Sequence, residues 1–110
     1  MKQTFSCPVE LALEVLGGKW RVVILAQVKQ GPLRYAELRR LIPRMSEKML
    51  SQRLRELVKS GLVAHQSGKY RLTPRGNRAR AALDALYAWG TTLERELDVR
   101  IETASVRSAS

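Results

Sequence analysis

Glycine and proline divide this chain into short segments, and these break points limit the fold more than any other feature of the sequence. The segments between them carry apolar residues at helical or strand spacing. The breaks are Gly17-Gly18, Gly31-Pro32, Pro43, Gly61, Ser67-Gly68 and Thr73-Pro74. Since the chain has 110 residues, we expect these short elements to pack around a single core.

Apolar spacing predicts four helices in the first sixty residues, over 8–16, 19–29, 35–42 and 47–60. Pro8 suits the first position of the first helix, and Cys7 is expected to be extended before it. Ser46 is a favourable N-cap for the fourth helix, and Gly61 is a favourable stop. The predicted buried stripe of the fourth helix consists of Leu50, Leu54, Leu57 and Val58.

The second half of the chain predicts a small hairpin and one long helix. Residues 62–66 and 69–73 are strand candidates around the turn Ser67-Gly68. Thr73-Pro74 is expected to start a single helix with an apolar period near 3.5, typical of a seam between helices. Its apolar positions are Ala79, Ala82, Leu83, Leu86, Trp89 or Gly90, Leu93 and Leu97.

The order of these elements predicts a mainly α fold with a small β-hairpin, a winged helix-turn-helix. In such a fold a short helix and a tight turn precede a polar-faced helix, and a hairpin follows. The domain is expected over residues 7–102, with a flexible N-terminus over 1–6 and a flexible tail over 103–110.

Basic residues are concentrated in the middle of the chain. The sequence has 20 Lys and Arg against 10 Asp and Glu, a formal net charge of +10. Residues 34–80 hold thirteen basic and three acidic side chains, whereas residues 1–33 have a net charge of +2 and residues 81–110 of −2. The alternative is a merely solvated surface, but ordinary surfaces intersperse both signs. The localised excess therefore predicts a polyanionic partner, either nucleic acid or an anionic membrane face.

The sequence also argues against several classes of function. One cysteine, Cys7, excludes an intrachain disulfide and a cysteine zinc cage, and His65 is expected on a strand surface. With so few reactive groups the chain is predicted not to be an enzyme and to need no metal or cofactor. No stretch approaches the ~18 apolar residues of a membrane span. Of the two polyanionic partners, nucleic acid is expected and a membrane is not. The first six residues lack the apolar run of a signal peptide, which together with the single thiol predicts a reducing cytoplasm.

The polar face of the fourth helix is the candidate reading surface. The residue types on this face can donate to or accept from base edges, or touch a thymine methyl. Base contacts are expected from Lys48, Met49, Ser51 and Gln52, and phosphate contacts from Arg53, Arg55 and Lys59. The hairpin is expected to add Lys69 and Arg71, and the flanking turns Arg34, Arg44 and Ser46. The alternatives are an ordinary amphipathic helix with a polar outside and a solvated hairpin edge.

Several motifs together resemble the HxlR-type regulators over roughly residues 7–90. The residues are Cys7-Pro8-Val9-Glu10, Leu16-Gly17-Gly18-Lys19-Trp20, Gly31-Pro32-Leu33-Arg34-Tyr35-Ala36-Glu37-Leu38-Arg39-Arg40, Ser46-Glu47-Lys48-Met49-Leu50-Ser51-Gln52-Arg53-Leu54-Arg55-Glu56-Leu57, Gly61-Leu62-Val63, Tyr70-Arg71-Leu72-Thr73-Pro74-Arg75-Gly76 and Leu86-Tyr87-Ala88-Trp89. The resemblance implies a bacterial transcription regulator with a MarR-like winged helix that dimerises through its N- and C-terminal helices. In several members the cysteine that matches Cys7 senses oxidants or electrophiles. The family usually has a longer wing, and Tyr35 stands where Phe is common.

The sequence thus predicts a homodimeric, sequence-specific double-stranded DNA-binding transcriptional regulator with a near-palindromic operator. A small molecule or an oxidant is the expected class of effector. Cys7 is either a sensing thiol at a helix N-terminus or a small buried apolar residue. The main alternative function is a winged-helix protein-interaction module without sequence-specific DNA binding; an RNA binder and a small enzyme are less well supported.

Overall fold

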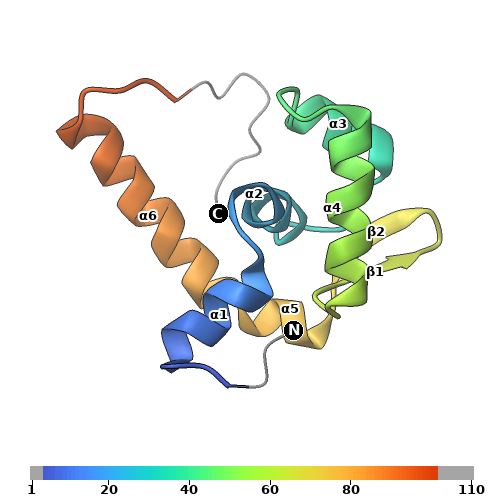
Figure 1. Ribbon diagram of the computed structural model, residues 1–110. Helices are drawn as coiled ribbons and strands as arrows, with labels where there is room; N and C mark the ends of the chain where they lie inside the picture. The colour runs from blue at the N-terminus through green and yellow to red at the C-terminus, as the bar shows by residue number, and fades with distance from the viewer. Residues whose placement is uncertain (1–3, 102–110) are drawn as a thin grey trace.

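The structure is a computed structural model that describes residues 4–101. The expected flexible tail over 103–110, residues 1–3 of the expected flexible N-terminus over 1–6, and residue 102 of the expected domain lie outside the described residues. In the described part the predicted order of elements is confirmed (Figure 1). The elements are α1 Pro8–Leu16, α2 Lys19–Val28, α3 Tyr35–Leu41, α4 Glu47–Lys59, β1 Val63–Gln66, β2 Lys69–Leu72, α5 Pro74–Arg78 and α6 Arg80–Glu96.

The first four helices begin and end at the predicted signals. Cys7 is extended, with φ −163° and ψ 165°, and Pro8 follows it as the first residue of α1. The Ser46 hydroxyl accepts a hydrogen bond of 3.1 Å from the backbone N–H of Met49, which caps the start of α4. Gly17 and Gly61 take positive φ values of 79° and 80° just after α1 and α4, a conformation that favours glycine.

The prediction of one long helix after Thr73 is wrong, because the chain forms α5 and α6 with Ala79 as the joint between them. Gly76 in α5 is buried so closely that a Cβ there would lie 2.1 Å from the carbonyl oxygen of Leu62. At the start of α6, Arg80 donates a 2.8 Å hydrogen bond to the carbonyl oxygen of Lys29. These contacts tie the two helices to earlier parts of the chain on either side of the joint at Ala79.

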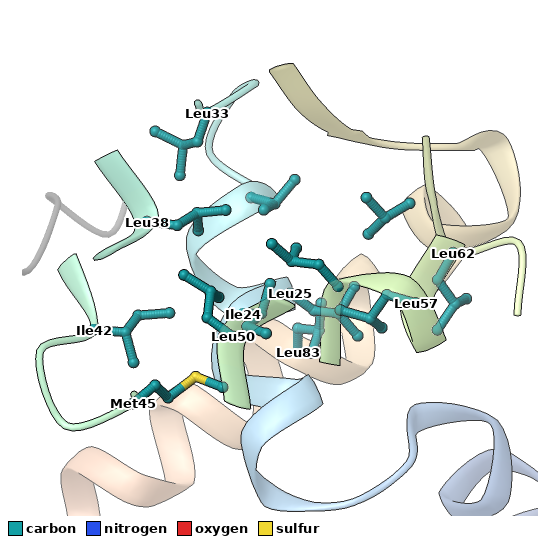
Figure 2. Packing of buried hydrophobic residues seen from close by; sticks show 13 residues of the cluster. Ile24, Leu25, Leu33, Leu38, Ile42, Met45, Leu50, Leu57, Leu62 and Leu83 are labelled. Atoms are coloured by element: carbon teal, nitrogen blue, oxygen red, sulfur yellow. The ribbon is translucent and has the colours of Figure 1, made fainter. Parts of the chain in front are cut away.

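The core lies between α2 at the centre and the helices and strands around it, as Figure 2 shows. Its α4 members are Leu50, Leu54 and Leu57, each at most 1% exposed. They belong to one cluster with apolar side chains from α2, from the segment before α3, from α3 and the turn that follows it, from the start of the hairpin and from α6. These are Ile24, Leu25, Val28, Leu33, Leu38, Ile42, Met45, Leu62, Val63 and Leu83.

Several predicted apolar positions are not in this core. Val58, placed in the buried stripe of α4, is 41% exposed. In α6 only Leu83 is buried, and in α1 no residue is. The two helices instead leave large apolar side chains at the surface, namely Val9, Leu11, Leu13, Leu86, Tyr87 and Trp89. In Figure 1, α6 runs on the opposite side of the molecule from α4, with α1 near its start.

The predicted hairpin is confirmed, with β1 and β2 antiparallel and Val63 paired with Leu72. Ser67 and Gly68 both have positive φ, 52° and 74°, as a two-residue type I′ turn requires. The backbone of Leu33 adds a one-residue third strand, since its N–H donates to Tyr70 at 3.0 Å and its carbonyl accepts from Tyr70 at 2.7 Å. The hairpin therefore stands beside α4 as the wing of a winged helix-turn-helix (Figure 1).

Candidate nucleic-acid interface

The outward face of α4 carries a stripe of polar and basic side chains. Lys48, Gln52, Arg55 and Lys59 recur every three or four residues, so they fall within about 60° of one another around the helix axis. All four are exposed, whereas Leu50, Leu54 and Leu57 on the opposite side are buried. The apolar stripe thus holds α4 in place and turns the polar stripe to solvent.

Hydrogen bonds between α3 and α4 fix the start of this helix. The Tyr35 hydroxyl donates to the carbonyl oxygen of Glu47 at 3.2 Å. The Ser51 hydroxyl donates to the Tyr35 oxygen at 3.3 Å. The Tyr35 hydroxyl therefore joins the two helices of the helix-turn-helix. A phenylalanine at this position would lack the hydroxyl and could form neither bond. Ser51 faces α3 rather than solvent and is half-buried.

An ion-pair network ties α4 to α2. The Glu56 carboxylate lies 3.2 Å from Nη1 of Arg53 and 3.6 Å from Nε of Arg21. Nε of Arg21 also donates to the carbonyl oxygen of Gly17, at the end of α1, at 3.2 Å. Arg53 was predicted to contact phosphate. The contact between Arg21 and Glu56, thirty-five positions apart, was not predicted, because nothing local in the sequence indicates it.

The predicted DNA contacts fall into two groups by exposure. Eight are exposed, namely Arg34, Arg44, Ser46, Lys48, Gln52, Arg55, Lys59 and Arg71. Four are half-buried, namely Met49, Ser51, Arg53 and Lys69. Met49 packs against the core and Arg53 pairs with Glu56, so both side chains already form contacts within the protein. Apart from Arg53, none of the basic residues in either group forms an ion pair within residues 4–101.

Other cations of the central block stabilise the fold instead. Arg39 donates to the carbonyl oxygen of Met45, in the turn before α4. Arg75 donates to the carbonyl oxygen of Ser60 at 2.8 Å, just after α4 ends. Arg80 bonds the carbonyl of Lys29 at the end of α2. Carbonyls near helix ends lack helical partners and accept such bonds. No sequence signal pointed to these contacts, because all three arginines lie inside helices and the partners of Arg75 and Arg80 are 15 and 51 positions away.

The hairpin brings further groups to the same side. The rings of His65 and Tyr70 are stacked, with centroids 4.0 Å apart and planes 8° from parallel. A Cβ on Gly68 would lie 2.9 Å from Nη1 of Arg34, so the Arg34 guanidinium lies against the turn of the hairpin. A groove of about 390 Å³ separates the hairpin from α4 and is lined by Leu54, Arg55, Val58, Lys59, His65 and Tyr70.

Cys7 lies apart from this surface, at the start of α1. It is exposed, which contradicts its interpretation as a small buried apolar residue. The backbone N–H groups of Glu10 and Val9 and the Ser6 hydroxyl hold the pKa of the thiol below its ordinary value, and slight desolvation opposes them. A lowered pKa gives more thiolate at neutral pH, and the thiolate is the reactive form.

Residues 4–101 contain no group of three or more His, Cys, Asp or Glu side chains arranged to hold a metal ion. Every helix in the same range is too short or too polar to span a bilayer.

A convex helix with an outward row of cations and an amide suits the major groove of a duplex. The groove is about 12 Å wide and admits one α-helix. The surface provides donors for base edges and charges for phosphates.

Comparison with known proteins agrees with this geometry. The sequence model of the HxlR-like helix-turn-helix family matches residues 15–97. The uncharacterized HTH-type transcriptional regulator YtcD of Bacillus subtilis (strain 168) is 40% identical over 96 residues, covering 81% of this chain and 76% of YtcD.

Two solved structures are also similar. The reduced form of the redox regulator HypR superposes with a TM-score of 0.72 at 33% identity and covers 83% of this chain and 96% of that one. Quinone-bound YodB from B. subtilis superposes with a TM-score of 0.69 at 36% identity and covers 78% of this chain and 99% of that one.

Proposed function

The chain belongs to the HxlR-like helix-turn-helix family of transcriptional regulators, which are not enzymes, and from that premise we propose that it binds a specific double-stranded DNA site as a homodimer. The observation that carries the proposal is the outward stripe of α4, formed by Lys48, Gln52, Arg55 and Lys59. None of these side chains is engaged by another side chain within residues 4–101, so they are available to a ligand. We propose that the protein acts in the cytoplasm, the compartment that holds the DNA.

The division between base and phosphate contacts follows position along α4. Residues near the start of a recognition helix usually reach deepest into the major groove. Lys48 and Gln52 are the best supported base contacts because they are both early and exposed. Met49 and Ser51 are less well supported as base contacts, because their side chains are half-buried. Arg55, Lys59, Arg44, Arg34, Lys69 and Arg71 are the proposed phosphate contacts.

Homodimerisation is supported by the apolar side chains of α1 and α6. Val9, Leu13 and Trp89, and Leu97 directly after α6, are each more than 60% exposed. A second copy of the chain would cover them, since a small domain gains much from burying such area. A twofold axis would place the two α4 helices in successive major grooves, about 34–36 Å apart, and the operator would then be a near-palindrome.

Regulation by an oxidant or electrophile at Cys7 is the second part of the proposal. Support comes from the exposed thiol with a lowered pKa and from the similarity to HypR and YodB. Two Cys7 thiols could lose two protons and two electrons to diamide, which is reduced to the hydrazine, and so form one S–S bond between protomers. This bond needs Cα atoms within about 7 Å; otherwise the product is a mixed disulfide with a small thiol.

Selection of bound fragments from a random duplex pool, with and without diamide, tests both parts. The expected result is enrichment of a near-palindrome and its loss under diamide. A double variant, Lys48→Ala with Gln52→Ala, is the control and should not enrich the same sequence. If no sequence is enriched and binding is insensitive to salt, the chain is a protein-interaction module instead. Enrichment that diamide leaves unchanged removes only the redox part.

A further inference from the structure

Lys29, directly after α2, is buried and bound to α6 by two polar contacts. Within residues 4–101 it is the one charged residue that is buried, and its side chain is 5% exposed. Its Nζ lies 2.9 Å from Oδ1 of Asp84, whose side chain is 56% exposed. Its backbone carbonyl oxygen accepts a 2.8 Å hydrogen bond from Nη1 of Arg80, one turn earlier in α6. A single residue at the end of α2 thus holds two successive turns of α6.

These two contacts determine the direction of α6. Leu83 is the only residue of α6 that is buried, and an apolar contact at one residue is not directional. Hydrogen bonds are directional, because they weaken steeply as their angle changes. Further along, α2 and α6 do not pack closely, since a cavity of about 400 Å³ lies between them, lined by Val23 of α2 and by Tyr87 and Thr91 of α6, among others. The angle between the two helices is therefore fixed mainly at Lys29.

The helix α2 in turn holds α4. Ile24 and Leu25 of α2 are fully buried in the core that includes the leucines of α4. Arg21 of α2 also meets Glu56 of α4. Figure 1 shows α2 between α4 and α6. The DNA-binding unit, formed by α2, α3, α4 and the hairpin, thus takes its orientation relative to α6 from the contacts of Lys29.

We propose that Lys29, Asp84 and Arg80 are positioning residues that set the spacing between the two half-sites of the operator. The inference rests on the proposed function, in which α6 helps to join two copies of the chain and α4 enters the major groove. From Asp84 to Glu96, α6 extends about 18 Å, at 1.5 Å per residue. A tilt of about 10° at Asp84 therefore moves the DNA-binding unit relative to the far end of α6 by about 3 Å. Successive base pairs lie about 3.4 Å apart, so such a tilt corresponds to about one base pair of spacing.

Two variants of opposite charge test the proposal. Lys29→Met removes the ammonium group, keeps a long apolar side chain and lowers the net charge of the chain by one. Asp84→Ala removes the carboxylate and raises the net charge by one. Binding is measured on the selected duplex and on duplexes in which the two half-sites are moved closer or further apart by one base pair.

Both variants should tolerate altered spacing better than the wild type. A change of one base pair should weaken wild-type binding about tenfold, because the hydrogen bonds to charged groups at Lys29 are strained or lost. The same change should weaken binding by either variant only about twofold, because those bonds are already absent. A base substitution inside a half-site should cost all three proteins the same, since the outward stripe of α4 is unchanged. A merely destabilising substitution would lower all affinities together and leave the ratio between spacings as it was.

Glu96→Ala is the matched control for Asp84→Ala. Glu96 is exposed on the same helix and forms no ion pair within residues 4–101. This variant should keep the wild-type dependence on spacing. Asp84→Ala leaves a buried charge without its partner, so thermal melts check that it folds. If it does not fold, the double variant Lys29→Met with Asp84→Ala replaces it, because that variant retains neither charge.

The angle of α6 is also measured without DNA. A spin label is attached at Arg40→Cys, an exposed position of α3, in a Cys7→Ser background. Pulsed electron paramagnetic resonance then gives the distance between the two labels of a dimer. We expect a narrow distribution of distances with Lys29 in place and a broader or shifted distribution with Lys29→Met.

The outcomes separate this proposal from the one on which it rests. If both variants fold and still lose about tenfold when the spacing changes, the angle of α6 is fixed elsewhere and the proposal is overturned. If Lys29→Met and Asp84→Ala shift affinity in opposite directions by the same factor at every spacing, net charge explains the effect, which also overturns it. If the wild type selects no duplex, the proposed function fails and the assignment of operator spacing fails with it. The label distance then still decides whether Lys29 sets the angle of α6.

Discussion

Replacing Arg55 by alanine should weaken DNA binding without changing sequence preference. Arg55 is exposed on α4, makes no ion pair within residues 4–101, and projects from the outward stripe. A cation that neutralises one phosphate contributes about 0.9 to the slope of log K against log salt. A homodimer carries two copies, so Arg55→Ala should reduce the magnitude of the slope by about 1.8.

The same relation gives the loss of affinity. At 0.15 M salt, counterion release is worth about fivefold per contact, so two lost contacts weaken binding about thirtyfold. Seven predicted cations of each protomer remain exposed or half-buried without an ion pair: Arg34, Arg44, Lys48, Arg55, Lys59, Lys69 and Arg71. If all of them contact phosphate, the slope for a dimer is no steeper than about −13.

Gln52→Ala is the matched comparison on the same stripe. The glutamine amide carries no charge, so its removal should leave the salt slope unchanged. If it forms a bidentate contact with adenine, its loss should reduce discrimination at one base step by about 1–3 kcal/mol. Random duplex should bind this variant as it binds the wild type.

Fluorescence anisotropy of labelled cognate and random duplexes, titrated at four salt concentrations, measures both quantities. Arg95→Ala is the charge control, because Arg95 is exposed on α6, on the side of the molecule away from α4 (Figure 1). An equal change of slope in Arg55→Ala and Arg95→Ala would refute the argument, since net charge rather than contact would then explain it. If Gln52→Ala loses the same affinity for cognate and for random DNA, the proposed base contact of Gln52 is refuted.

Three further predictions concern stability, assembly and the thiol. Gly76→Ala should destabilise the fold by about 2 kcal/mol, because the added Cβ meets the carbonyl oxygen of Leu62. Gly90→Ala, which has open space around the added Cβ, should be neutral or stabilising. Thermal melts compare the two variants, and the reverse order of stability would contradict the packing described. Trp89→Asp should shift the protein toward monomer in sedimentation experiments, and an unchanged dimer would place the interface elsewhere. Iodoacetamide should alkylate Cys7 with a half-maximal rate at a pH below that of an ordinary thiol, because the lowered pKa keeps thiolate present to lower pH. Unfolding in urea should raise this midpoint. Equal midpoints in the folded and unfolded protein would exclude stabilisation of the thiolate by the start of α1.

The elements that sequence alone predicted are those fixed by local chemistry. Ser46 and Gly61 bound α4, and Ser67-Gly68 forms the turn, because each acts through its own backbone or its immediate neighbours. The joint at Ala79 could not be predicted, since it depends on Gly76 meeting Leu62, which is distant in sequence. The same applies to Val58, whose helical position is apolar but whose exposure depends on where the hairpin stands.

The candidate site was predictable as a face but not residue by residue. The charge block and the period of α4 identify Lys48, Gln52, Arg55 and Lys59, because a stripe opposite a buried one must face outward. The spacing on α4 does separate Arg53 from Arg55, because Glu56 follows Arg53 at i+3 and pairs with it, whereas Arg55 has no acidic residue three or four positions away. The second pairing of Glu56, with Arg21 of α2, requires the tertiary structure.

The carboxylates of the central block explain why this face stays cationic. Residues 34–80 contain three acidic side chains. Glu37 accepts a 2.8 Å hydrogen bond from the backbone N–H of Arg34 and so stabilises the start of α3. Glu56 lies between Arg21 and Arg53. Glu47 occupies the first turn of α4, where a negative charge favours the helix. Two of the three carboxylates are thus engaged by the protein itself, and the third is confined to one helix end. The positive potential along the rest of α4 is therefore left without internal compensation, which is the condition for attracting a polyanion.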